Sequence, residues 1–289
     1  MSDNEETYKP APDSLTDSSE MPTFAKPLSF FEPFLSQIMV MIVKHTRFRS
    51  RPGLAEILEQ NPRLVVVFNH STPLSWLPAI ALLTAHACAR GGGPRRPMGV
   101  MDRFFFSVPG LRAIAHQLTQ SDRPLGFHDL IAKFHGSHGT DIVIFPEGSN
   151  CFFGDPSELQ PFRSPRFVEL AIRSSTPILL CAHRGSEKWA RVVPVDSRWT
   201  DKLDFLPKIV ADFLGARLRE SGILAIPTIP TPLEHFEMVC ELYHPTLSEA
   251  DLSTESDEAA EQIRLEADRV HAKLQSMLAE IDAGLPSES

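Results

Sequence analysis

Two short apolar runs, each ending abruptly in polar residues, constrain the fold of this chain more than any other feature. The first is Leu64–Phe68 (LVVVF), which is rich in β-branched residues and too short for an ordinary helix. The second is Asp141–Phe145 (DIVIF). Continuous apolar runs of this length are typical of parallel strands that are covered on both faces. We therefore expect an α/β fold with buried central strands.

The residues that follow these runs predict where a site lies. Asn69 and His70 follow the first run, and residues 146–150 (PEGSN) follow the second. In open α/β sheets, ligands bind in the crevice beyond the carboxyl ends of the strands, so His70 and Glu147 are expected to meet there. Taken singly, each cluster has a plainer interpretation, as a loop or core histidine and as a Pro-Glu-Gly turn.

Together and in this order, the two clusters resemble the motifs of the glycerolipid acyltransferase superfamily, the PlsC-like lysophosphatidic acid acyltransferases. That family has N-H-x4-D after one strand and F-P-E-G after a later one, and Asn69–His70 and Phe145–Gly148 match these motifs. The resemblance covers residues 64–195. It implies a layered α/β fold with a largely parallel central sheet flanked by helices. It also implies an enzyme, an acyltransferase of phospholipid biosynthesis, that moves a fatty acyl group from acyl-CoA or acyl-acyl carrier protein to a lyso-lipid hydroxyl.

The resemblance further implies roles for individual residues. His70 would be the general base that removes the proton of the acceptor hydroxyl. Arg123 would contact an anionic group of the acceptor, because a guanidinium pairs bidentately with phosphate or carboxylate. The alternative for Arg123 is a surface ion pair with Asp122 or another carboxylate. The residues expected to bind substrate are Asn69, Arg123, Phe145, Pro146, Glu147, Gly148, Ser149 and Asn150.

The chain departs from the family pattern at Ser75, which stands where the family has the aspartate that stabilises the histidine. Ser75 is predicted to accept a hydrogen bond from the ring of His70, but it carries no charge. In a Ser-His-Asp triad, loss of the carboxylate's function costs about 10⁴ in turnover. Three outcomes stay open. Another carboxylate replaces the missing one, the enzyme works slowly, or the chain retains a lipid-binding fold without catalysis. The replacement candidates are Asp102, Asp122 and Glu147.

A second departure concerns the acceptor. Asn150 stands where the family often has an arginine that binds the acceptor's phosphate. A neutral amide cannot neutralise an anion. This favours a lysophospholipid with a bulky head group, or a lyso-lipid without phosphate.

Composition and motifs bear on several other functions. The net charge of −9 argues against a general nucleic-acid binder. The four cysteines form no C-x-x-C pair, and His135 and His138 have no third ligand at a recognisable spacing, so we expect no metal site and no cofactor beyond the acyl donor. There is no hydrolase, Walker A or Rossmann motif. A hydrolase that uses Cys151 or a serine is a third hypothesis.

The ends of the chain differ in character from its middle. Residues 1–27 are acidic and polar and predict a disordered tail, followed by a single acyltransferase-like domain over residues 28–284. Residues 28–47 are largely apolar, which fits either a core helix or a helix that lies in a membrane interface. No apolar run reaches the ~18 residues that span a bilayer. We expect a cytoplasmic protein that associates peripherally with a membrane.

Further elements follow from periodicity and from turn residues. Expected helices cover residues 74–90, 129–138, 163–174 and 253–280. Expected strands cover residues 98–101, 176–182, 191–195, 223–229 and 236–242, with the last closing the sheet. The phenylalanine-rich stretch 102–116 is either core or the wall of a groove for an acyl chain.

Overall fold

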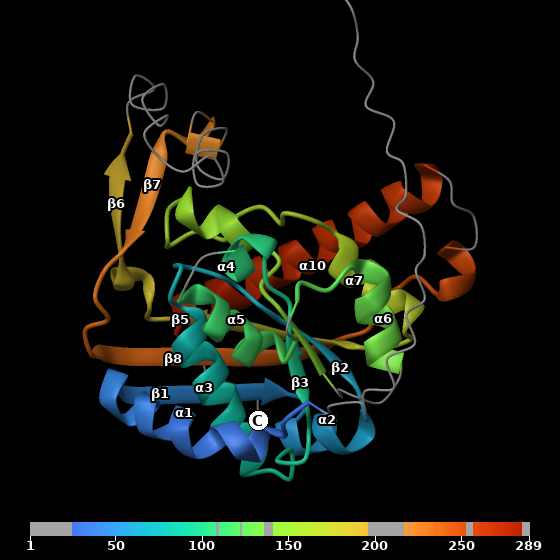
Figure 1. Cartoon of the computed structure of the whole chain (residues 1–289), viewed down its shortest axis with the longest axis horizontal. Coiled ribbons are helices and arrows are strands. Elements are labelled where there is room, and N and C mark those ends of the chain that lie inside the picture. Colours follow the sequence, from blue (N-terminus) through green and yellow to red (C-terminus); the bar gives the residue numbers. More distant parts are fainter. Residues whose placement is uncertain are drawn as a thin grey trace, which may run out of the picture.

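The computed structural model of the chain describes residues 25–107, 110–121, 123–135, 141–195, 217–218, 220–252 and 257–284. A six-stranded sheet has the order β1-β8-β5-β2-β4-β3 and is flanked by helices (Figure 1). Its strands are β1 (Val43–Arg51), β2 (Leu64–Phe68), β3 (Pro97–Gly99), β4 (Asp141–Ile144), β5 (Ile178–Arg184) and β8 (Leu233–Tyr243). The helices are α1 (Leu28–Ile42), α2 (Leu54–Gln60), α3 (Trp76–Cys88), α4 (Arg103–Ser107), α5 (Leu111–Thr119), α6 (Phe127–His135), α7 (Arg166–Arg173) and α10 (Asp257–Ala283).

The expected layered α/β fold is confirmed. Strands β3, β4, β2 and β5 are mutually parallel, and among the described strands of this sheet only the pairing of β5 with β8 is antiparallel. Strand β2 lies between β4 and β5, which explains why every residue of the LVVVF run is buried. Val65 and Val67 pack in one core with residues of α6, α7 and α10. Leu64, Val66 and Phe68 pack in a second core, on the opposite face, with residues of α1, α2 and α3.

The prediction of one apolar segment over residues 28–47 was wrong at its end. Helix α1 stops at Ile42, and the chain continues as the edge strand β1. The physical reason lies in the basic side chains of β1, which pair with glutamates of the neighbouring β8. Lys44 lies 2.8 Å from Glu234, and Arg49 lies 2.6 Å from Glu237. Strand β8 therefore lies inside the sheet, between β5 and β1, and does not close it as predicted.

Two predicted strands do not belong to the central sheet. Strand β6 (Ala190–Pro194) pairs antiparallel with β7 (Ile223–Pro227), and together they form a separate two-stranded ribbon at the upper left of Figure 1. Helix α2 was not predicted, because its seven residues are too few for a clear helical period. Helix α6 begins two residues earlier than predicted, and the predicted part beyond His135 lies outside the described residues.

Two regions with open interpretations can be placed. Helix α1 has one charged residue, Glu32, and leaves the apolar side chains of Phe30, Phe34, Val40 and Met41 exposed. Among the described residues, no helix combines the length and the apolar character needed to cross a bilayer.

Phe105 and Phe106 of the phenylalanine-rich stretch 102–116 are half-buried. Residues 1–24, most of the predicted tail, lie outside the described residues.

Candidate functional site

Three neighbouring strands end in polar residues at the same edge of the sheet. Strands β5, β2 and β4 are adjacent and parallel, so their carboxyl ends lie together. Asn69 and His70 follow β2, Glu147 follows β4, and His183 and Arg184 complete β5. The strand predicted over residues 176–182 stops one residue short of His183, so the end of β5 was not predicted to contribute to the site. The signal was present in the sequence, because β5 is a buried apolar run that ends in the polar residues His183 and Arg184, as β2 and β4 end in polar residues.

Glu147 joins the loops that follow β2 and β4. Its Oε1 accepts a hydrogen bond from the backbone N–H of His70 (2.5 Å), and its Oε2 accepts one from the backbone N–H of Gln160 (2.8 Å). The expected meeting of His70 and Glu147 is therefore confirmed. Glu147 is 0% exposed, and this burial raises the pKa of its carboxyl to about 7, although the two hydrogen bonds act to lower it. Both carboxylate oxygens hold backbone groups.

The imidazole of His70 contacts few polar atoms. Its Nε2 lies 3.9 Å from the Sγ of Cys151, and its ring centroid is 4.9 Å from that of Phe145. In the described part of the chain, Nδ1 is buried and has no hydrogen-bond partner. Burial lowers the pKa of His70 to about 4, while the nearby backbone of Gly148 and Pro73 acts in the opposite direction. The ring is therefore neutral at pH 7 and able to accept a proton.

Ser75 does not take the place that the resemblance implies. Its side chain is 0% exposed, and its hydroxyl donates to the carbonyl oxygen of Thr72 (2.9 Å) at the start of α3. The prediction that Ser75 hydrogen-bonds the ring of His70 was therefore wrong. The loop that leads into α3 turns the hydroxyl back onto its own backbone.

No replacement carboxylate contacts the ring of His70 among the described residues. Asp102 forms an ion pair with Arg163, and Glu147 holds backbone N–H groups. Asp122 lies outside the described residues. Without a carboxylate at Nδ1, an imidazolium formed at His70 lacks the stabilisation that a triad supplies.

The other residues of the F-P-E-G cluster form the wall beside His70. The rings of Phe145 and Phe68 stack with centroids 5.1 Å apart. The carbonyl of Pro146 accepts a hydrogen bond from the backbone N–H of Arg163. Gly148 has φ +52°, a conformation that favours glycine, and opens a short 3₁₀ helix over Gly148–Phe152.

Two expected contacts to the acceptor have other partners in the structure. The guanidinium of Arg123 is 71% exposed and lies 3.9 Å from the carboxylate of Asp129, as in the surface ion pair that was the alternative. Asn150 donates through its side chain to the carbonyl of Pro161 (2.7 Å), and Ser149 is buried. Ser149 and Asn150 carry no charge, and the charge of Arg123 lies beside that of Asp129.

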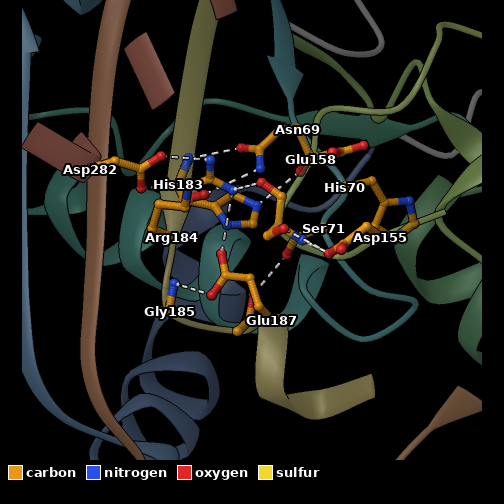
Figure 2. Close-up of polar contacts among 12 residues, drawn as sticks. Asn69, His70, Ser71, Asp155, Glu158, His183, Arg184, Gly185, Glu187 and Asp282 are labelled. Atoms are coloured by element: carbon orange, nitrogen blue, oxygen red, sulfur yellow. Dashed lines mark hydrogen bonds and ion pairs between the residues drawn. The ribbon is translucent and has the colours of Figure 1, made fainter. Parts of the chain in front are cut away.

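Cys151 and Arg184 are two further residues that the structure brings to this edge. Burial raises the pKa of the Cys151 thiol well above its ordinary value, and the nearby Glu147 raises it further. The thiol therefore stays protonated, which weakens the hypothesis of a cysteine nucleophile. The guanidinium of Arg184 forms two hydrogen bonds with Asp282, 3.0 and 2.9 Å long (Figure 2). In the described residues, no group of three or more potential ligands is placed to hold a metal ion.

The environment of Glu147 predicts how stability depends on pH. Its pKa is raised from 4.5 to about 7, so its contribution is fully present below pH 4.5 and is lost as the pH rises through 7. A displacement of this size corresponds to about 3 kcal/mol. In chemical denaturation, the stability of Glu147→Gln relative to the wild type should therefore rise by about 3 kcal/mol from pH 4.5 to 7. His70 and His183, whose pKa values are lowered, make stability change in the opposite direction over this range, and the comparison cancels their contribution because both proteins contain them. The exposed Glu158→Gln is the matched control. A Glu147→Gln profile that runs parallel to the wild type would contradict the buried, proton-linked carboxyl.

The comparisons with known proteins leave the family unassigned. No protein-family model matches the chain, and the search of curated proteins finds no match.

Proposed function

We propose that this protein is an acyltransferase that moves an acyl group from a thioester donor, acyl-CoA or acyl-acyl carrier protein, to a hydroxyl of a lyso-lipid. The observation that carries the proposal is the hydrogen bond between Glu147 and the backbone of His70, 2.5 Å long. It joins the two motif-bearing loops at the carboxyl ends of β2 and β4, where α/β folds bind ligands. The proposed base therefore lies at the edge of the sheet where such folds bind ligands, and His70 is partly exposed there.

The proposed reaction needs one proton acceptor. His70, neutral at pH 7, takes the proton of the acceptor hydroxyl as the oxygen attacks the thioester carbonyl. The tetrahedral intermediate then expels the donor thiolate, which takes the proton back from the imidazolium. Burial disfavours that imidazolium, and no carboxylate of the described residues contacts the ring to offset this cost. Slow turnover is therefore expected.

The surroundings of the site bear on the acceptor and on the membrane. Asn150 carries no charge, and Arg123 lies 3.9 Å from the carboxylate of Asp129, which favours a lyso-lipid without phosphate or one with a bulky head group. The exposed Phe30, Phe34 and Met41 of α1 support peripheral contact with the cytoplasmic surface of a membrane. A protein bound at this surface would take its lyso-lipid acceptor from the membrane.

A second candidate function rests on the same ring. Nδ1 of His70 has no partner in the described part of the chain, and Ser75 bonds to Thr72 instead. These two observations favour a catalytically weak or inactive protein that binds a lipid or a partner through the same fold.

One assay separates the two functions. Purified protein is incubated with labelled acyl-CoA or labelled acyl-acyl carrier protein and a panel of lyso-lipids, and free thiol and labelled lipid are measured. The acyltransferase proposal expects thiol release that depends on the lyso-lipid, matched by label in the lipid product. Saturable lipid binding without label transfer, with either thioester donor, would overturn it in favour of the second candidate.

A further inference from the structure

His183 is a buried histidine in β5, the strand that pairs with β2, and β2 leads into the proposed base His70. It is the penultimate residue of β5 and is 0% exposed. Its ring stacks against that of Phe236 from β8, with centroids 5.3 Å apart. Histidine is seldom fully buried unless its polar atoms have partners. The partners of this ring therefore indicate what the residue does.

Three hydrogen bonds join His183 to Asn69, the residue before His70. The backbone N–H of His183 donates to the side-chain oxygen of Asn69 (2.8 Å), and the side-chain amide of Asn69 donates to the carbonyl of His183 (3.2 Å). In return, Nε2 of the His183 ring lies 2.9 Å from the carbonyl oxygen of Asn69. Figure 2 shows these contacts as dashed lines between the two residues, with the ring of His70 lying apart from them.

The last of these contacts fixes the protonation of the ring. A carbonyl oxygen only accepts hydrogen bonds, so Nε2 of His183 carries the hydrogen. Nδ1 is then unprotonated, and in the described residues it has no hydrogen-bond partner. Burial lowers the pKa of His183 to about 3, so the ring stays neutral. A positive charge here would also oppose protonation of the neighbouring His70.

The peptide group between Asn69 and His70 is consequently held at both ends. Its carbonyl accepts from the ring of His183, and its N–H donates to Glu147. The ring of His70 itself has no carboxylate partner among the described residues, so no side chain of that kind sets its orientation. Its position must follow from the backbone that carries it and from the walls of Phe145 and Cys151.

We propose that His183 is a positioning residue for His70. Its Nε2–H holds the Asn69–His70 peptide group, and this contact sets where the imidazole of His70 stands when the acceptor hydroxyl approaches. The role rests on the proposed function, in which His70 takes the proton. In this role, a hydrogen bond to the backbone beside His70 orients the imidazole. It replaces the aspartate that the chain lacks at residue 75, where Ser75 stands.

Two variants separate positioning from simple packing. His183→Gln keeps an N–H donor near the place of Nε2, whereas His183→Leu keeps a similar volume without a donor. We expect His183→Leu to lower kcat for acyl transfer at least tenfold with little change in KM, and His183→Gln to stay within about threefold of the wild type. Val270→Ala, in the buried face of α10, is the control for loss of packing.

A readout without activity keeps this test separate from the proposed function. The imidazole nitrogen resonances of His70, followed by NMR across a pH titration, should shift in His183→Leu and match the wild type in His183→Gln. If the wild type transfers no acyl group, the proposed function fails while the NMR comparison still decides the positioning role. Unchanged His70 resonances and an unchanged kcat in a folded His183→Leu would overturn the proposal.

Discussion

His70→Ala should slow acyl transfer by about 10²- to 10⁴-fold, the range that a positioned general base contributes. In the proposed mechanism, His70 is the one proton acceptor for the acceptor hydroxyl among the described side chains discussed for the site. Glu147 engages backbone N–H groups with both oxygens, and the Cys151 thiol stays protonated. The measurement is kcat from labelled acyl-CoA into the lipid found by the panel assay, with folding checked by circular dichroism.

The control for this variant is His86→Ala. His86 lies on the same chain segment, near the end of α3, about 15 Å along the helix from its first turn. It contacts Arg90 and Phe48 instead of the site. We expect His86→Ala to keep the wild-type rate. A His70→Ala protein that also keeps that rate would remove His70 from the mechanism.

Asp141→Ala should lower the free energy of unfolding by about 3–5 kcal/mol, the cost of breaking one partner out of a buried ion pair. Asp141 opens β4 and accepts two hydrogen bonds from the guanidinium of Arg95, one of them 2.8 Å long. Both side chains are more than nine-tenths buried. Arg95 also donates to the carbonyls of Leu58 and Asn61, so the pair ties β4 to the end of α2.

Denaturant unfolding of three variants tests the role of this pair. The double variant Arg95→Met with Asp141→Leu should recover much of the loss, because it leaves no buried charge without a partner. Asp282→Ala, which breaks the more exposed pair with Arg184, should cost about 1 kcal/mol or less. A loss below about 1 kcal/mol in Asp141→Ala would mean that water reaches Arg95.

The central strands were predictable because their signal is local. Strand β2 is a continuous apolar run, and β4 is apolar after Asp141. The polar residues that follow each strand lie in the same short segment of sequence. The edge strand β1 was not predictable in this way. Its lysine and arginine side chains gain partners only when Glu234 and Glu237, about 190 residues later, lie beside them.

The sequence predicted which residues lie together at the candidate site better than it predicted which atoms of those residues form hydrogen bonds. The meeting of His70 and Glu147 follows from parallel strands that end at one edge. The atoms involved do not follow from it, since Glu147 binds the backbone of His70 and not its ring. Ser75 turns to Thr72, and the ring of His183 reaches Asn69. Such choices depend on side-chain direction, which residue spacing does not determine.

The dependence of kcat/KM on pH tests most directly whether the half-buried imidazole of His70 is the base. For the free enzyme, this profile reports the pKa of the essential group. Because burial lowers the pKa of His70 to about 4, we predict a rate that does not fall as the pH is lowered from 6.5 to 5 and declines only near pH 4. A decline centred near pH 6.5, the value of an ordinary imidazole, would contradict the account.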